Sequence, residues 1–131
     1  MFLPKYQVVE IVSEAVLRRA VLAVKYQHTR DGEVVDHVIA PFDIGSSNPH
    51  NAQKFSNNLY AYSYTRISEK TGLSDPKVVT FSISHFIQMQ PNDETFDETD
   101  LCIKNMEASP RRFDYRTYRF ALLPERDWFR S

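Results

Sequence analysis

The spacing of apolar residues along the chain changes period near residue 20. Before that point the apolar positions repeat every three or four residues, with polar side chains on the other side: Val8, Ile11, Val12, Ala15 and Val16. This repeat predicts an amphipathic helix of about three turns. Pro4 precedes the segment and Arg18 and Arg19 follow it, which suits the two ends of a helix.

Strict alternation of apolar and polar residues follows the helix and predicts strands. Residues 22–27 form the first alternating segment, and the Asp-Gly pair at 31 and 32 predicts a tight hairpin turn. The returning strand covers residues 34–39. We expect it to end at Pro41, because proline cannot donate to a central ladder.

The rest of the chain continues with short alternating segments. A polar loop at 45–58 and a turn region at 68–76 separate some of them, and whether the first of these has a function stays open. Further strands are predicted at 59–67, 79–83 and 118–123, and a short strand or turn, ended by Pro91, at 86–89. One helix followed by a run of short antiparallel strands predicts a mainly β fold, a small antiparallel β-barrel with an N-terminal helix.

Composition places the chain among ordinary globular proteins. It has 131 residues, of which 42% are hydrophobic and 25% charged, and this excludes a disordered class. The single cysteine, Cys102, cannot form an internal disulfide. No apolar stretch is long enough to cross a membrane, and the N-terminus lacks the pattern of a signal peptide. We expect a soluble cytoplasmic protein with no membrane partner.

The formal net charge of −1 is unevenly distributed. Residues 109–131 hold six arginines against three acidic residues, a net of +3, so the remaining residues carry −4. Five acidic side chains fall within residues 92–100. We therefore divide the chain into a barrel domain with its helix, residues 1–108, and an arginine- and aromatic-rich C-terminal extension, residues 109–131, that packs on the same domain.

The extension interleaves basic and aromatic residues between positions 111 and 120. Such a composition suits phosphate contacts with base stacking, or docking on a protein partner. The arginines that we expect to make these contacts are Arg111, Arg112, Arg116 and Arg119. The same alternation also suits an ordinary strand. We favour an extension that is folded onto the barrel over one that is free in solution.

The order of the motifs resembles that of the WYL domain family. Residues 57–59 stand where the family has Trp-Tyr-Leu, and 81–87 where it has Arg-x-Phe-x-Leu-Asp-Arg-Ile. The resemblance covers residues 8–96. The matching segments are, in order, Val-Lys-Tyr at 24–26, Val-Ile-Ala-Pro-Phe-Asp-Ile at 38–44, Asn-Asn-Leu at 57–59, Phe-Ser-Ile-Ser-His-Phe-Ile at 81–87 and Glu-Thr-Phe at 94–96.

The resemblance implies an Sm-like or SH3-like β-barrel that senses ligands or binds nucleic acid. WYL domains commonly follow a helix-turn-helix in bacterial transcription regulators, many of them tied to phage defence and CRISPR systems. The family's ligand-facing arginines correspond here to His37, Val79 and His85. Histidine is charged only in part near neutral pH, whereas arginine stays charged, so a phosphate site inherited from the family is weakened.

His37 and His85 are accordingly the first candidates for a ligand site, together with Tyr26 or Tyr62. Imidazole and phenol rings can hold a nucleobase by stacking and hydrogen bonding. Tyr62 also belongs to a stripe of tyrosines at 60, 62 and 64 with Arg66 at its end, which is a stacking platform for single-stranded bases. The alternative for His37 and His85 is an ordinary surface or hydrogen-bonded histidine on a barrel strand, and for the tyrosine stripe it is packing under the helix or the C-terminal extension. We favour the structural interpretation in both cases.

Motifs for catalysis and for metal binding are missing from the sequence. It contains no glycine-rich phosphate loop, nucleophile elbow or zinc-protease helix. Ser84 and His85 are neighbours that point to opposite faces of a strand, so they do not form a nucleophile–base pair. The four histidines and Cys102 lack metal-ligand spacing. We expect a protein that is not an enzyme and has no cofactor.

Two hypotheses for function follow from these patterns. The first is a non-catalytic ligand-sensing or regulatory module, resembling WYL domains, that binds a nucleotide or a fragment of single-stranded nucleic acid and modulates a partner. The second is a structural or interaction protein, in which the barrel and the C-terminal extension assemble a homodimer or a complex with another protein.

Overall fold

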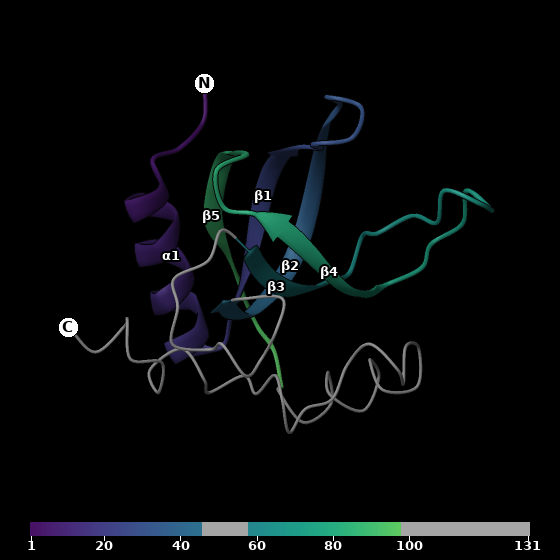
Figure 1. Ribbon diagram of the computed structural model, residues 1–131. Coiled ribbons are helices and arrows are strands. Elements are labelled where there is room, and N and C mark those ends of the chain that lie inside the picture. Colours follow the sequence, from purple (N-terminus) through teal and green to yellow (C-terminus); the bar gives the residue numbers. More distant parts are fainter. Residues whose placement is uncertain (46–57, 98–131) are drawn as a thin grey trace.

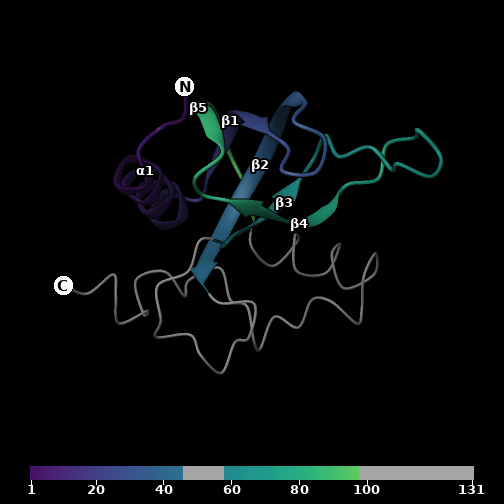
Figure 2. The same ribbon diagram turned by 45° about the horizontal axis from the view of Figure 1, so that its top comes forward.

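The described part of the chain forms one helix and a five-stranded antiparallel sheet. The computed structural model describes residues 1–45 and 58–97. The elements are α1 (Lys5–Arg18), β1 (Ala20–Gln27), β2 (Val34–Gly45), β3 (Asn58–Ser63), β4 (Lys77–Ser82) and β5 (Phe86–Thr95), as Figure 1 shows. The strand order is β4-β3-β2-β1-β5, with the 12-residue β2 crossing the middle of the sheet (Figure 2). The predicted mainly β fold with an N-terminal helix is confirmed.

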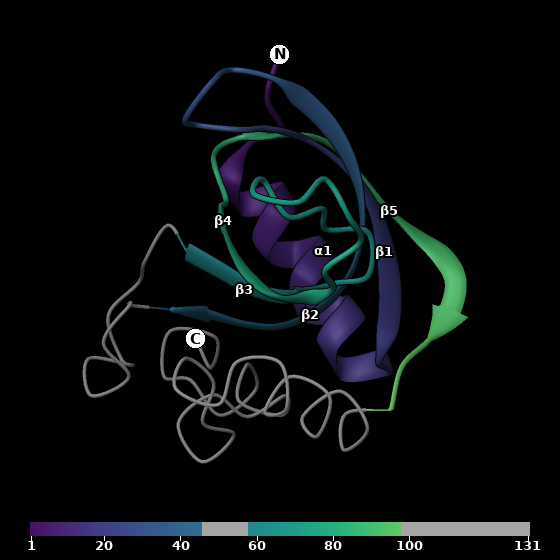
Figure 3. The ribbon, with the colours of Figure 1, turned by 90° about the vertical axis from the view of Figure 1, so that its right-hand side faces the viewer.

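The sheet is strongly curved. β4 and β5 are its two edges, yet only residues 83–85 connect them. So short a link can join opposite edges only when the sheet curls until these edges approach each other, and Figure 3 shows this curl. Among the described residues no ladder joins β4 to β5, so the sheet is not closed and the expected barrel is only approximate.

Helix α1 lies against the concave side of the sheet. It begins at Lys5, because Pro4 presets the entry of the chain and its carbonyl accepts the first two main-chain hydrogen bonds. It ends where Arg19 adopts a left-handed conformation. The predicted apolar stripe is confirmed, since Val8, Val12, Ala15 and Val16 are buried. No helix within the described ranges is long and apolar enough to span a bilayer.

The two faces of the sheet carry separate apolar clusters. The concave face joins the helix to all five strands, as the alternation of residues 22–26 predicts: Leu22, Val24, Tyr26, Ile39, Leu59, Phe81 and Phe86 are buried there. The convex face holds a smaller cluster of Val21, Ala40, Tyr60, Tyr62 and Phe96. The tyrosine stripe therefore lies on the face opposite Tyr26.

Two prolines expected to end strands lie inside them. β2 continues past Pro41 to Gly45, and the pairing of β2 with β3 shifts register between Pro41 and Asp43. β5 continues past Pro91 to Thr95, with a register shift in its pairing with β1. Both expectations were wrong. The pairing is irregular next to Pro41, so its missing N–H does not interrupt a regular ladder. Pro91 lies in an edge strand, which forms ladder hydrogen bonds on one side only.

Other boundaries differ by a few residues. The β1–β2 connection is longer than a two-residue turn: His28 N–H donates to Glu33 O, and Gly32 takes the positive φ (74°) of the loop. β3 ends at Ser63, before the predicted end at 67, and β4 ends at Ser82. The predicted strand at 118–123, the division at residue 108 and the extension at 109–131 lie outside the described residues.

A matched pair of leucine substitutions tests this core. Leu22 is fully buried at 0% exposure between α1 and the sheet, whereas Leu73 is 68% exposed in the segment before β4. We expect Leu22→Ala to lower the free energy of unfolding by about 2–5 kcal/mol, because it leaves a cavity. Leu73→Ala should change it by less than about 0.5 kcal/mol. Urea denaturation of both variants is the measurement, and equal effects would contradict the assigned core.

Candidate functional site

Three rings meet where the β1–β2 hairpin leaves the sheet. Tyr26 near the end of β1 makes an edge contact with His28 (centroids 5.4 Å apart) and lies 6.5 Å from His37 of β2. The two imidazoles are 5.5 Å apart, and His37 Nε2 lies 3.5 Å from His28 Nε2. The hairpin thus brings together two histidines nine positions apart in the sequence.

Tyr26 connects this group of rings to the hydrophobic core. Its ring packs edge-on against Phe81 at 4.9 Å and lies at the same distance from Phe86. Its hydroxyl accepts a hydrogen bond from Ser82 N–H at 2.8 Å. Burial raises the pKa of the hydroxyl, and the Ser82 hydrogen bond offsets part of that rise. Tyr26 is therefore held in place and stays neutral under ordinary conditions.

His37 is a buried histidine with few polar neighbours. It is 7% exposed, its Nδ1 lies 3.4 Å from Ser63 Oγ, and its ring faces Phe81 at 5.3 Å. Burial lowers the pKa of His37, and the positive charge of a protonated His28 lowers it further, while Asp36 acts in the opposite direction. The neutral imidazole is consequently the favoured form near neutral pH.

A groove of about 480 Å³ opens above these rings. We call it the imidazole groove. Its walls come from the β1–β2 loop, from the ends of β2 and β4, and from the segment after β3. Its polar lining consists of two histidines, two arginines and three acidic residues, along with threonine hydroxyls: His28, His37, Arg30, Arg66, Asp31, Glu33 and Glu69. Val79, where the family resemblance implies an arginine, also lines it.

Both arginines of the groove are engaged in ion pairs. Arg30 contacts Glu69 at 2.5 Å across the opening, and both side chains are more than 70% exposed. Arg66 contacts Asp75 at 2.5 Å and is better buried, at 27% exposure. Asp75 N–H also donates to the Arg66 carbonyl. Arg66 and Asp75 thus join the two ends of the loop between β3 and β4. An exposed pair contributes little to stability, so Arg30 is the arginine more easily released.

His85 lies close to the ring cluster but does not line the groove. Its ring stacks on Phe2 at 5.1 Å and lies 6.4 Å from Tyr26. Its Nδ1 is buried and has no hydrogen-bond partner among the described residues. The neighbouring Ser84 hydroxyl is 2.9 Å from the Ser82 hydroxyl. Two of the predicted residues, Tyr26 and His37, are thus brought into contact, and His85 lies beside Tyr26 without lining the groove.

The remaining predicted residues are separated from this group or not described. Tyr62 belongs to the convex cluster, with its ring 5.2 Å from Tyr64. Arg66 lines the groove, although it bonds to Asp75 rather than ending a tyrosine platform. The interpretation of Tyr60 and Tyr62 as buried packing residues agrees with their exposures of 6% and 7%. Arg111, Arg112, Arg116 and Arg119 lie outside the described residues.

Sequence reasoning missed five of the seven histidine and charged residues that line the groove, and His28 and Arg30 are the two of these on which the site depends most. Both lie in the β1–β2 loop, and nothing in the alternation pattern marks them. The available signal was their place beside the Asp-Gly turn, which returns the chain toward the strand that carries His37. Only the curvature of the two strands determines that the side chain of His28 reaches His37.

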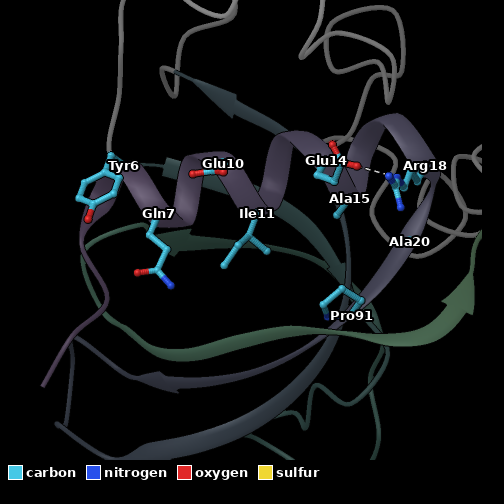
Figure 4. A pocket seen from close by; sticks show the side chains of 9 residues that line it. All are labelled: Tyr6, Gln7, Glu10, Ile11, Glu14, Ala15, Arg18, Ala20 and Pro91. Carbon is cyan, nitrogen blue, oxygen red and sulfur yellow. Dashed lines mark ion pairs between the residues drawn. The ribbon is translucent and has the colours of Figure 1, made fainter.

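A second, larger groove of about 660 Å³ lies between α1 and β5 (Figure 4). Ile11, Ala15 and Pro91 supply apolar surface, while Glu14 and Arg18 form an ion pair at its edge. None of the predicted site residues lines it. Because it holds no histidine and its one basic residue, Arg18, is paired with Glu14, we locate the candidate site in the imidazole groove.

The Tyr26 hydroxyl provides a test of how the ring cluster is held. Tyr26→Phe keeps the ring but removes the acceptor of the Ser82 N–H. We expect the free energy of unfolding to fall by about 1–3 kcal/mol, since a donor is left unpaired. Tyr6→Phe is the matched control, because Tyr6 is 74% exposed. Guanidinium denaturation measures both, and an unchanged Tyr26→Phe variant would contradict the proposed anchoring.

The lowered pKa of His37 predicts a pH dependence of stability. Its folded-state pKa lies below the unfolded value of about 6.5, so the unfolded chain binds more protons in this range. The contribution of neutral His37 is fully present above about pH 6.5 and is lost as the pH falls from there toward the folded pKa. Unfolding free energies measured from pH 7.5 down to pH 5 should therefore decrease.

The control for this effect is His37→Gln, which cannot titrate. It should flatten the pH dependence, whatever its effect on stability at pH 7.5. A nuclear magnetic resonance titration of the His37 ring should place its folded pKa below the unfolded value. The same slope in the variant and the native chain would assign the pH dependence to other groups.

Comparison with known proteins adds little to this description. No family model matches the chain, and no curated protein matches it either. Among solved structures it is similar to proteasome accessory factor B/C (PafBC) of Arthrobacter aurescens, with a TM-score of 0.48 and 17% identity. The alignment covers 72% of this chain and 12% of that one. We base no functional argument on a likeness at this level, and the relation to WYL domains stays a prediction from the sequence motifs.

Proposed function

We propose that this chain is a non-catalytic, WYL-like regulatory module that binds a nucleotide or a short single-stranded nucleic acid in the imidazole groove and thereby modulates a partner. The observation that carries the proposal is the composition of this groove. Its lining combines the imidazoles of His28 and His37 with the guanidiniums of Arg30 and Arg66. Aromatic rings stack on nucleic-acid bases, and one guanidinium can donate two parallel hydrogen bonds to two oxygens of a phosphate.

The charges of the groove decide which group receives a phosphate. With neutral imidazoles the lining carries three carboxylates against two guanidiniums, so it has no excess positive charge. A phosphate must therefore replace a carboxylate that already binds an arginine. The Arg30–Glu69 pair is exposed on both sides and is the less costly one to exchange. Arg66 is tied to Asp75 by its side chain and main chain and keeps its structural role.

The second hypothesis, assembly through the C-terminal extension, concerns residues 109–131, which lie outside the described ranges. The imidazole groove is therefore the feature on which the function is proposed. Protein partners enter the proposal as the targets that ligand binding regulates.

Titration with nucleoside phosphates and short single-stranded oligonucleotides tests the proposal. We expect binding at low salt, with affinity that decreases as salt is added, because phosphate contacts release counterions. Arg30→Gln should weaken binding of an oligonucleotide and reduce the slope of log K against log salt by about 0.7, the amount for one phosphate contact on a single strand. Calorimetry or fluorescence anisotropy at several salt concentrations gives both quantities.

Lys70→Gln is the matched control, since Lys70 is an exposed cation in the same segment as Glu69 but does not line the groove. It should leave the salt slope unchanged. Absence of any binding at low salt would overturn the proposal, because phosphate-driven affinity is greatest there. Binding that is equal in the native chain and in Arg30→Gln would move the site away from this groove.

A further inference from the structure

We infer that His28 and His37 form a two-histidine site for a divalent transition-metal ion at the wall of the imidazole groove. Their Nε2 atoms are 3.5 Å apart, whereas the ring centroids are 5.5 Å apart, so each ring turns its Nε2 toward the other. At 3.5 Å the two nitrogens are near the outer limit for a hydrogen bond, so a direct bond between the rings is weak. An ion held between the two nitrogens is the alternative to this weak bond.

The distance fits two imidazoles bound to one ion. Histidine nitrogens lie about 2.0–2.1 Å from zinc, so two of them at a near-tetrahedral angle are about 3.4 Å apart. The Nε2 atoms of His28 and His37 already stand at this separation. An ion between them would need almost no movement of either ring, and imidazole is a ligand that suits zinc, copper and nickel.

Ser63 provides the outer contact that such a ligand requires. Its side chain is fully buried on β3, and its Oγ lies 3.4 Å from His37 Nδ1. When Nδ1–H donates to this oxygen, the lone pair of Nε2 is left for an ion. Metal-binding histidines almost always have a partner of this kind on the second nitrogen, because it sets the tautomer and the ring orientation.

The surroundings favour a cation and leave room for its other ligands. Three carboxylates line the groove, and Glu33 follows closely after His28, whose N–H donates to the Glu33 carbonyl. Residues 1–45 and 58–97 contain no group of three or more histidine, cysteine or acidic side chains arranged to hold a metal. The ion is therefore held by two protein nitrogens, with water from the open groove completing its coordination.

This inference goes beyond the proposed function, since it requires no nucleotide. The probe is the metal alone, Zn²⁺ by calorimetry and Co²⁺ by its visible absorption, added to the whole chain without a histidine tag. We expect one ion per chain. Ser63→Ala, which removes only the outer contact, should lower the affinity by about 10–100-fold, and His28→Gln, which removes one of the two ligands, should lower it further.

His85→Gln is the matched control, because His85 lies near the same rings but does not line the groove. It should keep the native affinity. Nuclear magnetic resonance of the imidazoles gives an independent reading in the native chain, where Zn²⁺ should shift the rings of His28 and His37 and leave that of His85 in place. This second measurement decides the matter if a substitution disturbs folding.

Two results would overturn the inference: native affinity in His28→Gln, or zinc-induced shifts that avoid the rings of His28 and His37. Neither result affects the test of the proposed nucleotide site, which measures the effect of Arg30→Gln without added metal ions. Conversely, metal binding that requires His28, without any binding of oligonucleotides, would leave the metal site standing and remove the proposed function.

Discussion

The hydrogen bond from Ser82 N–H to the Tyr26 hydroxyl ties the first strand to the end of the fourth. These residues are 56 positions apart, and the bond sits where β4 turns through residues 83–85 into β5. It holds together the point at which the two edges of the curved sheet approach each other. The rings of Phe81 and Phe86 pack against Tyr26 on both sides of this turn. Together with the ladders between the strands, this contact fixes how the two edges of the sheet approach each other.

The same ring cluster also determines the chemistry of the site. Phe81 and Tyr26 bury His37 and favour its neutral form, and among the described residues its side chain has polar contacts with Ser63 and His28. A neutral imidazole is a weak phosphate ligand but a good metal ligand. With both imidazoles neutral the groove lining carries a net charge of −1, and a divalent ion at the histidine pair would change this to +1. The proposed metal would therefore also favour a phosphate at Arg30.

Local sequence patterns predicted the helix and most strands correctly. They failed at two prolines, where the pairing with neighbouring strands tolerates a residue that lacks an N–H donor. The helix around Val12 and the strand through Leu22 depend on one apolar face each, which short-range periodicity reveals. Pro41 and Pro91 were read as strand ends, because their missing N–H is a local property. Whether that N–H is needed depends on the partner strand and its register, and residue spacing does not report either.

The sequence by itself determined the class of the fold and the faces of its elements, since burial of an apolar stripe follows from periodicity alone. It also marked Tyr26 and His37 as site candidates. Only the tertiary structure decided that Tyr62 lies on the opposite face, that Arg66 binds Asp75 and that His28 meets His37. These relations depend on the curvature of the sheet and on how its loops return, which are set by many weak contacts acting together across distant segments.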